Sequence, residues 1–576
     1  MEIGLIAVAA VVVLVGTSIL GSKIGVAAPL LLVIVGIGAG YLPFVPPVEI
    51  DPEIILIGVL PPLLYSAAVN VPLVDFRRNL RPVVGLSVLL VIISAVAIGF
   101  ILHWAVPAIP LPAAIALGAV ISPTDAVAAT SIGKRLGMPE RLVSILEGES
   151  LVNDATSLVL LKTALAAVAG SFVFWDAAGS FGFSVIAAIA IGLVMGAVTV
   201  WIRSKLRNPV YDTIISFVVP FVAFMPAEEL GASGVLAVVV TGLYTGHHAA
   251  KRFSATARMN ERLNWRTVQF GLENGVFLVM GLQLHTLLDE VDDTQLQLEH
   301  VALVALGLVA VLILLRGLFM VPLIWSMRGD QGRYQQRSDG FTRILTRARR
   351  AETTERRLRK LELLEQRSRA DLAHEREQQL GWRDGVLLSW SGMRGVVTLA
   401  AAQSISTDVP YRPQLILIAF AVAVVTLLLH GLTLPLLIAK LWPEGANGSR
   451  TAELQSLGRD LLEAADTALE DEIENDAEAE DGRIVPDDDV VKRVRAAAKS
   501  TLAPLVFPSV STGATRAFAQ ETQAACYRRL ARTVLDAQRD ALLEERAIGR
   551  YSSQALRAAE LALDAQETRI TPPLAH

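Results

Sequence analysis

Two aspartates that fall deep inside long apolar runs are the residues most able to do chemistry in this chain. Asp125 ends a Ser-Pro-Thr-Asp motif, and 29 residues later Asp154 ends a Glu-Gly-Glu-Ser-Leu-Val-Asn-Asp motif. An ionisable side chain at membrane depth costs at least a few kcal/mol, so we expect it to serve a function. Hard cations and protons compete for carboxylate, amide and hydroxyl oxygens. Such oxygens are also present beside the aspartates, on Thr124, Ser150 and Asn153.

Three further charged residues are predicted at a similar depth. Arg394 lies near the middle of one apolar run, Arg316 lies near the middle of another, and Glu149 lies five residues before Asp154. Arginine stays protonated in proteins, so neither arginine can be the group that exchanges protons. We interpret Glu149 and Arg316 as a pair whose charges neutralise each other.

The helix that carries Asp125 is predicted to be interrupted, because Pro123 lacks a backbone N–H and clashes with the preceding turn. Gly392 and Gly395 flank Arg394 and favour a matching interruption there. Freed backbone groups at membrane depth are tolerated only where they line a cavity or an ion site, and transporters build their central sites from such discontinuous helices. The alternative is that the proline only kinks its helix and the glycines only permit close packing.

The apolar runs predict an all-α polytopic membrane protein. The chain has 576 residues, of which 53% are hydrophobic, and its mean hydropathy is +0.50. Runs of about 20 apolar residues can cross a bilayer as helices. We predict thirteen spans, at 3–20, 24–41, 53–70, 82–106, 112–133, 143–169, 179–202, 211–226, 232–247, 266–285, 300–326, 384–406 and 413–440. The single cysteine, Cys526, excludes a disulfide framework and a cysteine metal site.

The loop charges predict the orientation of these spans. Alternate loops carry basic residues, such as Arg77, Arg203 and Arg258, whereas the intervening loops carry acidic ones, such as Asp51 and Glu228. Cytoplasmic loops hold the excess of lysine and arginine. The alternation therefore predicts a multi-pass protein of the plasma (inner) membrane, with the N-terminus outside and the C-terminus in the cytoplasm.

Residues 1–440 are predicted to form the membrane domain, and two segments, one inserted in this domain and one after it, are predicted to lie outside the bilayer. Residues 328–383 form a highly charged helical insert, which we interpret as a solvated cytoplasmic segment and not as a nucleic-acid site, since acidic and basic residues alternate. Residues 441–576 form a cytoplasmic tail with amphipathic helical periodicity. This pattern predicts a small helical bundle that is regulatory or oligomeric.

The two aspartate motifs resemble the core of the monovalent cation/proton antiporter superfamily, specifically its sodium/proton exchanger branch with an Asn-Asp pair. Further similar elements are Leu60-Pro-Pro-Leu-Leu-Tyr65, Ser233-Gly-Val-Leu-Ala237 and Gly392-Met-Arg-Gly-Val396. The resemblance covers nearly the whole membrane part. It implies a homodimer with inverted repeats and crossed broken helices at the fifth and twelfth spans. It also implies a transporter that is not an enzyme and needs no cofactor beyond the transported Na+ and H+.

Carried over residue by residue, the resemblance implies that Na+ or a proton binds at Asp154 and Asp125, with further ligands from Asn153, Thr124 and Ser150. Glu149 with Arg316 would be a supporting ion pair, and Arg394 would neutralise the ends of the broken helices. The chain departs from many relatives at Ser66, where they carry an acidic residue. Glu273 lies at mid-span, and its role stays open between a second proton-accessible acid and a partner of a buried donor.

The expected function is antiport of Na+, Li+ or K+ against H+, which would serve pH and sodium homeostasis. Asp154 would alternate between proton and cation in an electroneutral 1:1 exchange, because the Asn153 amide cannot titrate and arginines keep their protons. A K+/H+ antiporter is the nearest alternative. An intramembrane aspartyl protease is the distant alternative. It needs two carboxylates that share a proton and activate water, and it does not explain Asn153, Ser150, the Glu149–Arg316 pair or thirteen spans. A channel needs a ring or filter that the sequence does not present.

Overall fold

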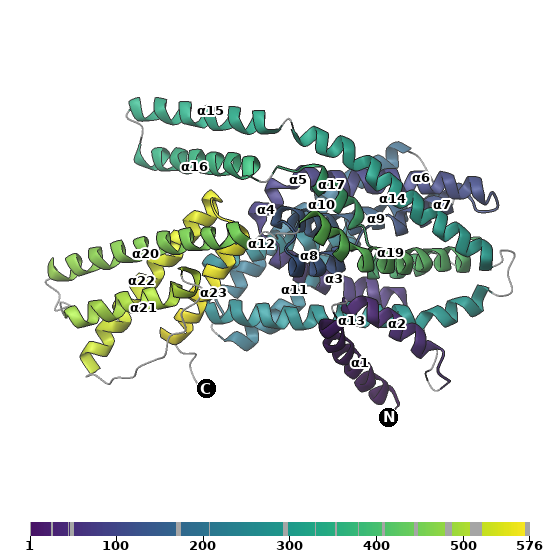
Figure 1. Cartoon of the computed structure of the whole chain (residues 1–576), viewed down its shortest axis with the longest axis horizontal. Helices are drawn as coiled ribbons and strands as arrows, with labels where there is room; N and C mark the ends of the chain where they lie inside the picture. Colours follow the sequence, from purple (N-terminus) through teal and green to yellow (C-terminus); the bar gives the residue numbers. More distant parts are fainter. Residues whose placement is uncertain are drawn as a thin grey trace. The chain divides into compact units, whose positions relative to one another are not determined.

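The structure is a computed structural model. It describes residues 2–24, 27–43, 45, 51–168, 174–206, 208–291, 298–328, 330–351, 354–377, 379–405, 409–442, 447–478, 487–506 and 521–570. Every regular element in these ranges is a helix, so the predicted all-α class is confirmed (Figure 1). The chain divides into two units: residues 1–247, 261–328 and 380–445 form the first, and residues 248–260, 329–379 and 446–576 form the second.

The first unit contains the apolar helices. They are α1 (Glu2–Ile24), α2 (Ala28–Gly40), η1 (Ile54–Val59), α3 (Leu60–Asn70), α4 (Leu73–Arg78), α5 (Leu80–Val84), η2 (Gly85–Leu89), α6 (Leu90–Ala105), α7 (Leu111–Ile121), α8 (Ala126–Leu136), α9 (Glu140–Val168), α10 (Phe174–Arg203), α11 (Pro209–Glu229), α12 (Gly234–Arg252), α13 (Ala255–Val291), α14 (Leu298–Arg328), α17 (Trp382–Trp390), α18 (Val396–Gln403) and α19 (Arg412–Leu441). The ends of α12 and α13 that face each other in sequence belong to the second unit.

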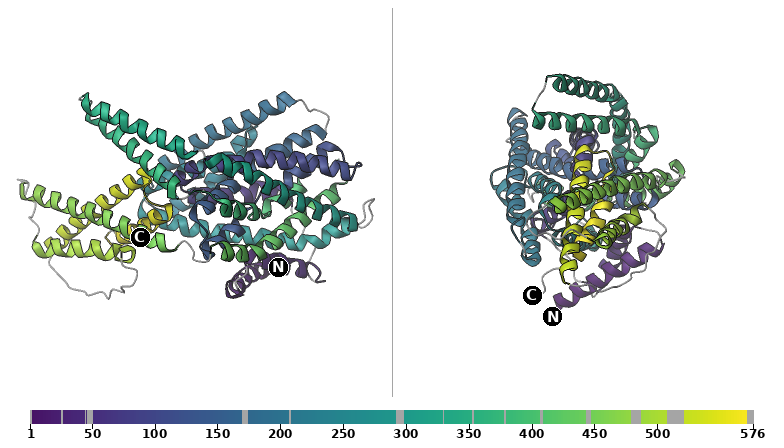
Figure 2. Two further views of the ribbon diagram at one scale, coloured as in Figure 1. Left: turned by 45° about the horizontal axis from the view of Figure 1, so that its top comes forward. Right: turned by 90° about the vertical axis from the view of Figure 1, so that its left-hand side faces the viewer.

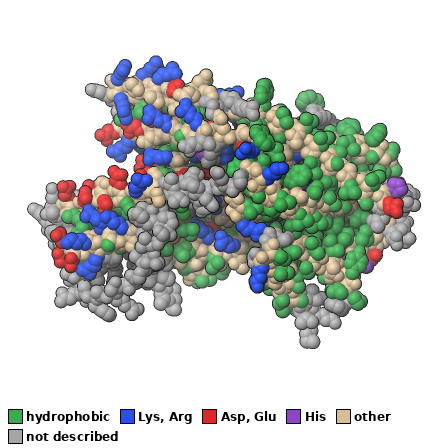
Figure 3. All heavy atoms as spheres, in the orientation of Figure 1, with side chains coloured by type: hydrophobic (Ala, Val, Ile, Leu, Met, Phe, Trp, Pro, Cys, Tyr) green, Lys and Arg blue, Asp and Glu red, His purple; other side chains and the backbone are tan. Residues whose placement is uncertain are grey.

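One to three consecutive helical segments occupy each of the thirteen predicted ranges. Among the described residues, seven helical segments are long and apolar enough to cross a bilayer, and three shorter apolar helices lie at Val8–Gly21, Ala28–Gly40 and Ile54–Asn70. The protein is therefore a multi-pass membrane protein, whereas the number thirteen stays a prediction. Apolar side chains cover the face of these helices that Figure 3 shows, while charged side chains gather over the other elements.

Helices α6 and α7 pack closely because two glycines remove the side chains between them. A Cβ atom on Gly118 would lie 2.3 Å from the Ala95 carbonyl oxygen, and one on Gly99 would lie 2.4 Å from Cγ1 of Ile115. Small residues let helix backbones approach in membranes, where apolar burial alone does not drive helices together. These contacts hold α7, which leads to Asp125, firmly against α6.

Two apolar clusters meet along α9. Residues on its first turns, such as Leu142 and Leu146, belong to a large cluster with residues of α6, α7, α14 and α19. Leu151 and Ala155 belong to a second cluster with residues of α3, α11 and α12. Helix α9 therefore joins the two clusters, and it carries Asp154 beside Ala155 of the second cluster.

The second unit is charged and entirely helical in its described part. Helices α15 (Asp330–Arg350) and α16 (Glu355–Glu377) form an antiparallel hairpin, and α20 (Asn447–Glu478), α21 (Asp488–Val506), α22 (Glu521–Ile548) and α23 (Ser553–Ile570) form a bundle (Figure 2). The turn between α22 and α23 is predicted from Gly549, and this glycine does adopt a left-handed conformation with φ of 74°.

An ion cluster inside the second unit joins the α12–α13 connection to α23. Arg258 is 3% exposed and donates hydrogen bonds to Asp564 and to the Phe253 carbonyl oxygen. Arg539 on α22 donates to the same Asp564 oxygen at 3.1 Å. Burial and the neighbouring Arg258 lower the pKa of Arg539. One carboxylate therefore serves two guanidinium groups.

Candidate functional site

The helix predicted to break at Pro123 is interrupted there. Helix α7 ends at Ile121, and α8 begins at Ala126 after four residues that do not continue the helix. Asp125 is the N-cap of α8, and its Oδ1 accepts a hydrogen bond of 2.8 Å from the Val127 N–H. This geometry satisfies one of the free N–H groups at the helix start and leaves Oδ2 outside that bond.

The second interruption lies at the glycines around Arg394. Helix α17 ends at Trp390, and α18 begins at Val396. The two interrupted segments contact each other, since the Asp125 N–H donates to the Met393 carbonyl oxygen over 2.8 Å. A Cβ atom on Gly395 would lie 2.1 Å from Oδ2 of Asp125. Only glycine therefore lets the second segment approach the Asp125 carboxylate this closely.

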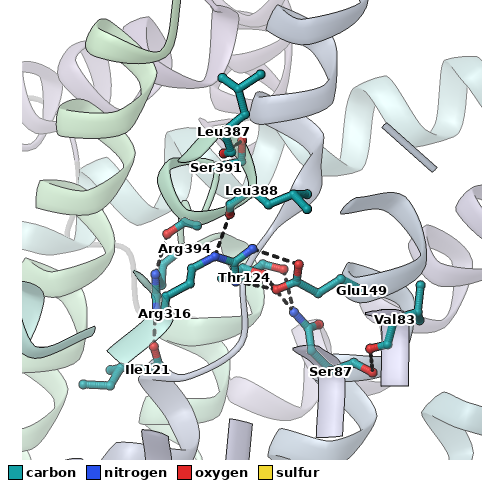
Figure 4. Close-up of polar contacts among 12 residues, drawn as sticks. Val83, Ser87, Ile121, Thr124, Glu149, Arg316, Leu387, Leu388, Ser391 and Arg394 are labelled. Carbon is teal, nitrogen blue, oxygen red and sulfur yellow. Dashed lines mark hydrogen bonds and ion pairs between the residues drawn. The ribbon is translucent and has the colours of Figure 1, made fainter. Parts of the chain in front are cut away.

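Arg394 lies where the carboxyl ends of both half-helices leave carbonyl groups without helical partners. Its Nε donates to the Ile121 carbonyl oxygen at 3.0 Å, and its Nη1 donates to that of Gly392. Arg316 on α14 adds a bond of 2.8 Å to the Leu388 carbonyl oxygen (Figure 4). The carboxyl end of a helix carries partial negative charge. Both arginines thus offset the charge of the helix ends inside the unit.

Glu149 and Arg316 form a bidentate ion pair between α9 and α14. The Arg316 nitrogens Nη1 and Nη2 lie 2.5 Å and 2.8 Å from the two Glu149 oxygens, and both side chains are buried. The Thr124 hydroxyl donates to Oε1 of Glu149 at 2.7 Å (Figure 4). Asn153 donates from Nδ2 to the Thr124 carbonyl oxygen at 2.8 Å. The pair and the amide together hold the first interrupted segment against α9.

Asp154 differs from Glu149 because no basic side chain of the described residues is paired with it. Its side chain is buried, and its carboxylate makes no hydrogen bond or ion pair with any described residue. It interacts electrostatically with Asp125. Ser150 precedes Asp154 by four residues on α9, so the two share one helix face. The Oδ1 atom of Asn153 is buried and receives no hydrogen bond within the described part of the chain.

The arrangement therefore contains two carboxylates in apolar surroundings, and the nearby guanidinium groups are already bonded elsewhere. Such an oxygen-rich site of negative charge suits a hard monovalent cation or protons. Asp125, Asp154, Asn153 and Ser150 retain oxygens for a ligand. The hydroxyl and carbonyl of Thr124 are engaged by Glu149 and Asn153, so its role as a cation ligand stays a prediction.

The sequence does not predict the polar connection between Ser66, Gln269 and Glu273. The Ser66 hydroxyl on α3 donates to Oε1 of Gln269 at 3.0 Å, and Nε2 of Gln269 donates to Oε1 of Glu273 at 2.6 Å. Gln269 and Glu273 lie one turn apart on α13, which a four-residue spacing indicates. The contact with Ser66 spans 203 residues of sequence, and no local pattern signals it.

Residues 8–440 match the family described as sodium/hydrogen exchanger, transmembrane. An uncharacterised Na+/H+ exchanger of Mycobacterium tuberculosis (strain ATCC 25618 / H37Rv) is 31% identical over 447 residues, which cover 76% of this chain and 74% of that protein. A sodium, potassium, lithium and rubidium/H+ antiporter of Bacillus pumilus is 30% identical and is matched over 78% of this chain and 63% of its own length.

The fold is similar to that of a solved structure, the sodium proton antiporter MjNhaP1 from Methanocaldococcus jannaschii at pH 8. The TM-score is 0.56 at 17% sequence identity, and the match covers 77% of this chain and 99% of that one. At this identity the likeness supports the fold of the membrane unit.

Proposed function

The chain belongs to the sodium/hydrogen exchanger family, as its motifs indicate, and from this premise we propose that it exchanges Na+ for H+ with Asp154 as the exchanging group. A proton on Asp154 is released to one side of the membrane, and a cation takes its place between Asp154 and Asp125. Asn153 and Ser150 contribute further oxygens, and Thr124 does so when its present bonds open. Arg394 and the Glu149–Arg316 ion pair hold the interrupted helices in position around the site.

One observation carries this proposal: the buried carboxylate of Asp154 interacts with the half-buried carboxylate of Asp125, and no described basic group is paired with Asp154. A buried carboxylate is costly unless a cation or a proton compensates its charge. A fixed guanidinium beside Asp154 would neutralise its charge permanently, as Arg316 does for Glu149. Because no described guanidinium is paired with Asp154, its charge must be compensated by a cation or a proton from solution.

We further propose a 1:1 electroneutral stoichiometry. Asn153 cannot titrate, and arginines do not release protons in proteins, so Asp154 alone exchanges a proton for a cation while Asp125 stays ionised. Sodium is the proposed main substrate and lithium a second one. A K+/H+ activity is the alternative, and the name of the Bacillus pumilus relative includes potassium beside sodium, lithium and rubidium.

The proposed setting follows the loop charges and the resemblance. The protein would lie in the plasma membrane as a homodimer, with thirteen spans, inverted repeats, an external N-terminus and a cytoplasmic C-terminus. The membrane domain would run from residue 1 to residue 440, and the tail would regulate it. Its cellular role would be pH and sodium homeostasis.

Purified protein in liposomes that enclose a pH-sensitive dye tests the proposal. Addition of Na+, Li+ or K+ in turn should dissipate an imposed pH gradient, most strongly with Na+. The Asp154→Asn protein should be folded and inactive, since its amide cannot carry the proton. Asp289→Asn makes the same chemical change at an exposed position and should exchange normally. Normal exchange by the Asp154→Asn protein would overturn the assignment.

A further inference from the structure

Glu273 is a half-buried acid on an apolar helix, and no described basic group offsets its charge. It lies at the middle of α13, about 27 Å from either helix end at 1.5 Å per residue. Its one hydrogen bond to the described residues comes from the neutral amide of Gln269, and it makes no ion pair with them. Glu149 has a guanidinium on both oxygens, so the two mid-helix glutamates are in opposite situations.

The amide that contacts Glu273 is held in one orientation. Its oxygen accepts from the fully buried Ser66 on α3, which leaves its NH2 group to donate to Glu273. The next residue, Asn274, has a buried Oδ1 that receives no hydrogen bond from the described residues, while its NH2 group donates to the Phe270 carbonyl oxygen. The described surroundings thus supply Glu273 with one fixed hydrogen-bond donor and no ion-pair partner.

Glu273 lies within electrostatic reach of the cation site, because the Asp125 carboxylate acts on it in addition to the contact with Gln269. A third carboxylate that adds to this negative field would attract cations towards the site. A purely structural acid would instead be expected to have a basic partner, as Glu149 does. Both observations favour a role of Glu273 in which its carboxylate binds a cation or a proton from solution.

We propose that Glu273, held by Gln269 and Ser66, is an auxiliary subsite that binds the monovalent cation on its way to Asp125 and Asp154. This inference rests on the proposed antiport function and adds to it a residue that sets the apparent cation affinity. The subsite takes the same class of ligand, a monovalent hard cation, through the Glu273 carboxylate. Asp154 still performs the exchange, so the subsite acts on substrate capture.

The test is the concentration dependence of Na+-driven proton movement in liposomes. Glu273→Gln should raise the KM for Na+ about tenfold, the loss of one charge–charge interaction of about 1.4 kcal/mol, and should leave the maximal rate within about twofold. Glu273→Asp keeps a carboxylate and should stay close to the unaltered protein. A structural role would instead lower the amount of folded protein and the maximal rate and leave KM unchanged.

An independent check places the carboxylate on the other side of Gln269, at position 66 in place of position 273. Ser66→Asp combined with Glu273→Gln should recover at least half of the lost affinity for Na+. Ser66→Asn combined with Glu273→Gln should not, because asparagine has the size of aspartate without its charge. If the unaltered protein exchanges Na+ for H+ and Glu273→Gln has the same KM, the subsite is refuted and the antiport function stands. If the unaltered protein does not exchange Na+ for H+, both are refuted.

Discussion

Glu149 and Asp154 lie on the same helix, five residues apart, and their surroundings are opposite. Arg316 occupies both oxygens of Glu149, and no described partner reaches Asp154. Their types and spacing predict that both are buried, and the convergence of Glu149 with Arg316 is also expected from depth alone. Which oxygens stay free could not be predicted, because it depends on contacts such as Thr124 with Glu149 and Asn153 with Thr124.

The Glu149–Arg316 pair should be strongly coupled in a double-mutant cycle. Removal of one partner leaves the other charge buried, so Glu149→Ala or Arg316→Ala should each lower stability in detergent by about 3–5 kcal/mol. The double substitution should cost less than the sum. Lys134 and Glu147 are a matched control, because their ion pair of 2.6 Å is more exposed and should contribute about 0–1 kcal/mol. Additive losses for the buried pair would argue against coupling.

At the scale of elements, both helix interruptions follow from residues that the sequence displays. Pro123 predicts the end of α7, and Gly392 with Gly395 predict the gap between α17 and α18. The π-helical segment η1, Ile54–Val59, is not predicted, although it comes directly before Pro61 and Pro62. Each proline ring clashes with the carbonyl one turn earlier, and a wider turn relieves this clash, but a kink would relieve it equally well.

Gly395→Ala should impair exchange although Gly395 has no functional group. The added Cβ would lie 2.1 Å from Oδ2 of Asp125, so the carboxylate or the interrupted segment must move. A displacement of about 1 Å at a site can reduce rates by roughly 100-fold, and we expect at least a tenfold loss in the liposome assay. Gly307→Ala on α14 has open space around its Cβ and should exchange normally. Equal rates for both variants would show that Asp125 tolerates the shift.

At the scale of the whole molecule, hydropathy and loop charge predict a multi-pass helical membrane protein with charged helices outside it. They do not predict that residues 248–260, which connect two apolar helices, belong with the tail. The Arg258–Asp564 contact spans 306 residues, and an arginine in a basic loop gives no sign of its partner. Pairings between distant parts of a chain are decided by tertiary packing.

Asp564→Ala should loosen the second unit more than its size suggests. Buried Arg258 and half-buried Arg539 would lose their shared carboxylate but keep Glu560 and Glu567 as acidic partners, so we expect a loss of about 1.5–3 kcal/mol for the charge-assisted hydrogen bonds. Limited proteolysis of the full-length protein should then cut α23 faster. Asp536→Ala on α22 removes an exposed carboxylate and serves as the control. Equal cleavage of the two variants would mean that the cluster does not hold α23.

Exchange should not respond to an imposed membrane voltage if one proton leaves for each cation that enters. In liposomes with a potassium–valinomycin potential, the rate of Na+-driven proton movement should be the same at either sign of voltage. A clear voltage dependence would mean that a second titrating group takes part. Glu273→Gln would then identify the group, since it should remove that dependence.

The unpaired charge of Asp154 also bears on how tightly sodium flow is tied to proton flow. A carrier that turned over with neither ligand bound would have to move two bare carboxylates through apolar packing, and the desolvation cost of several kcal/mol per ion makes such turnovers rare. Slippage would let a gradient run down without useful work. Here the desolvation cost of the ligand-free carrier would suppress slippage. The tight coupling of sodium flow to proton flow would then result from the absence of a described basic partner for Asp154.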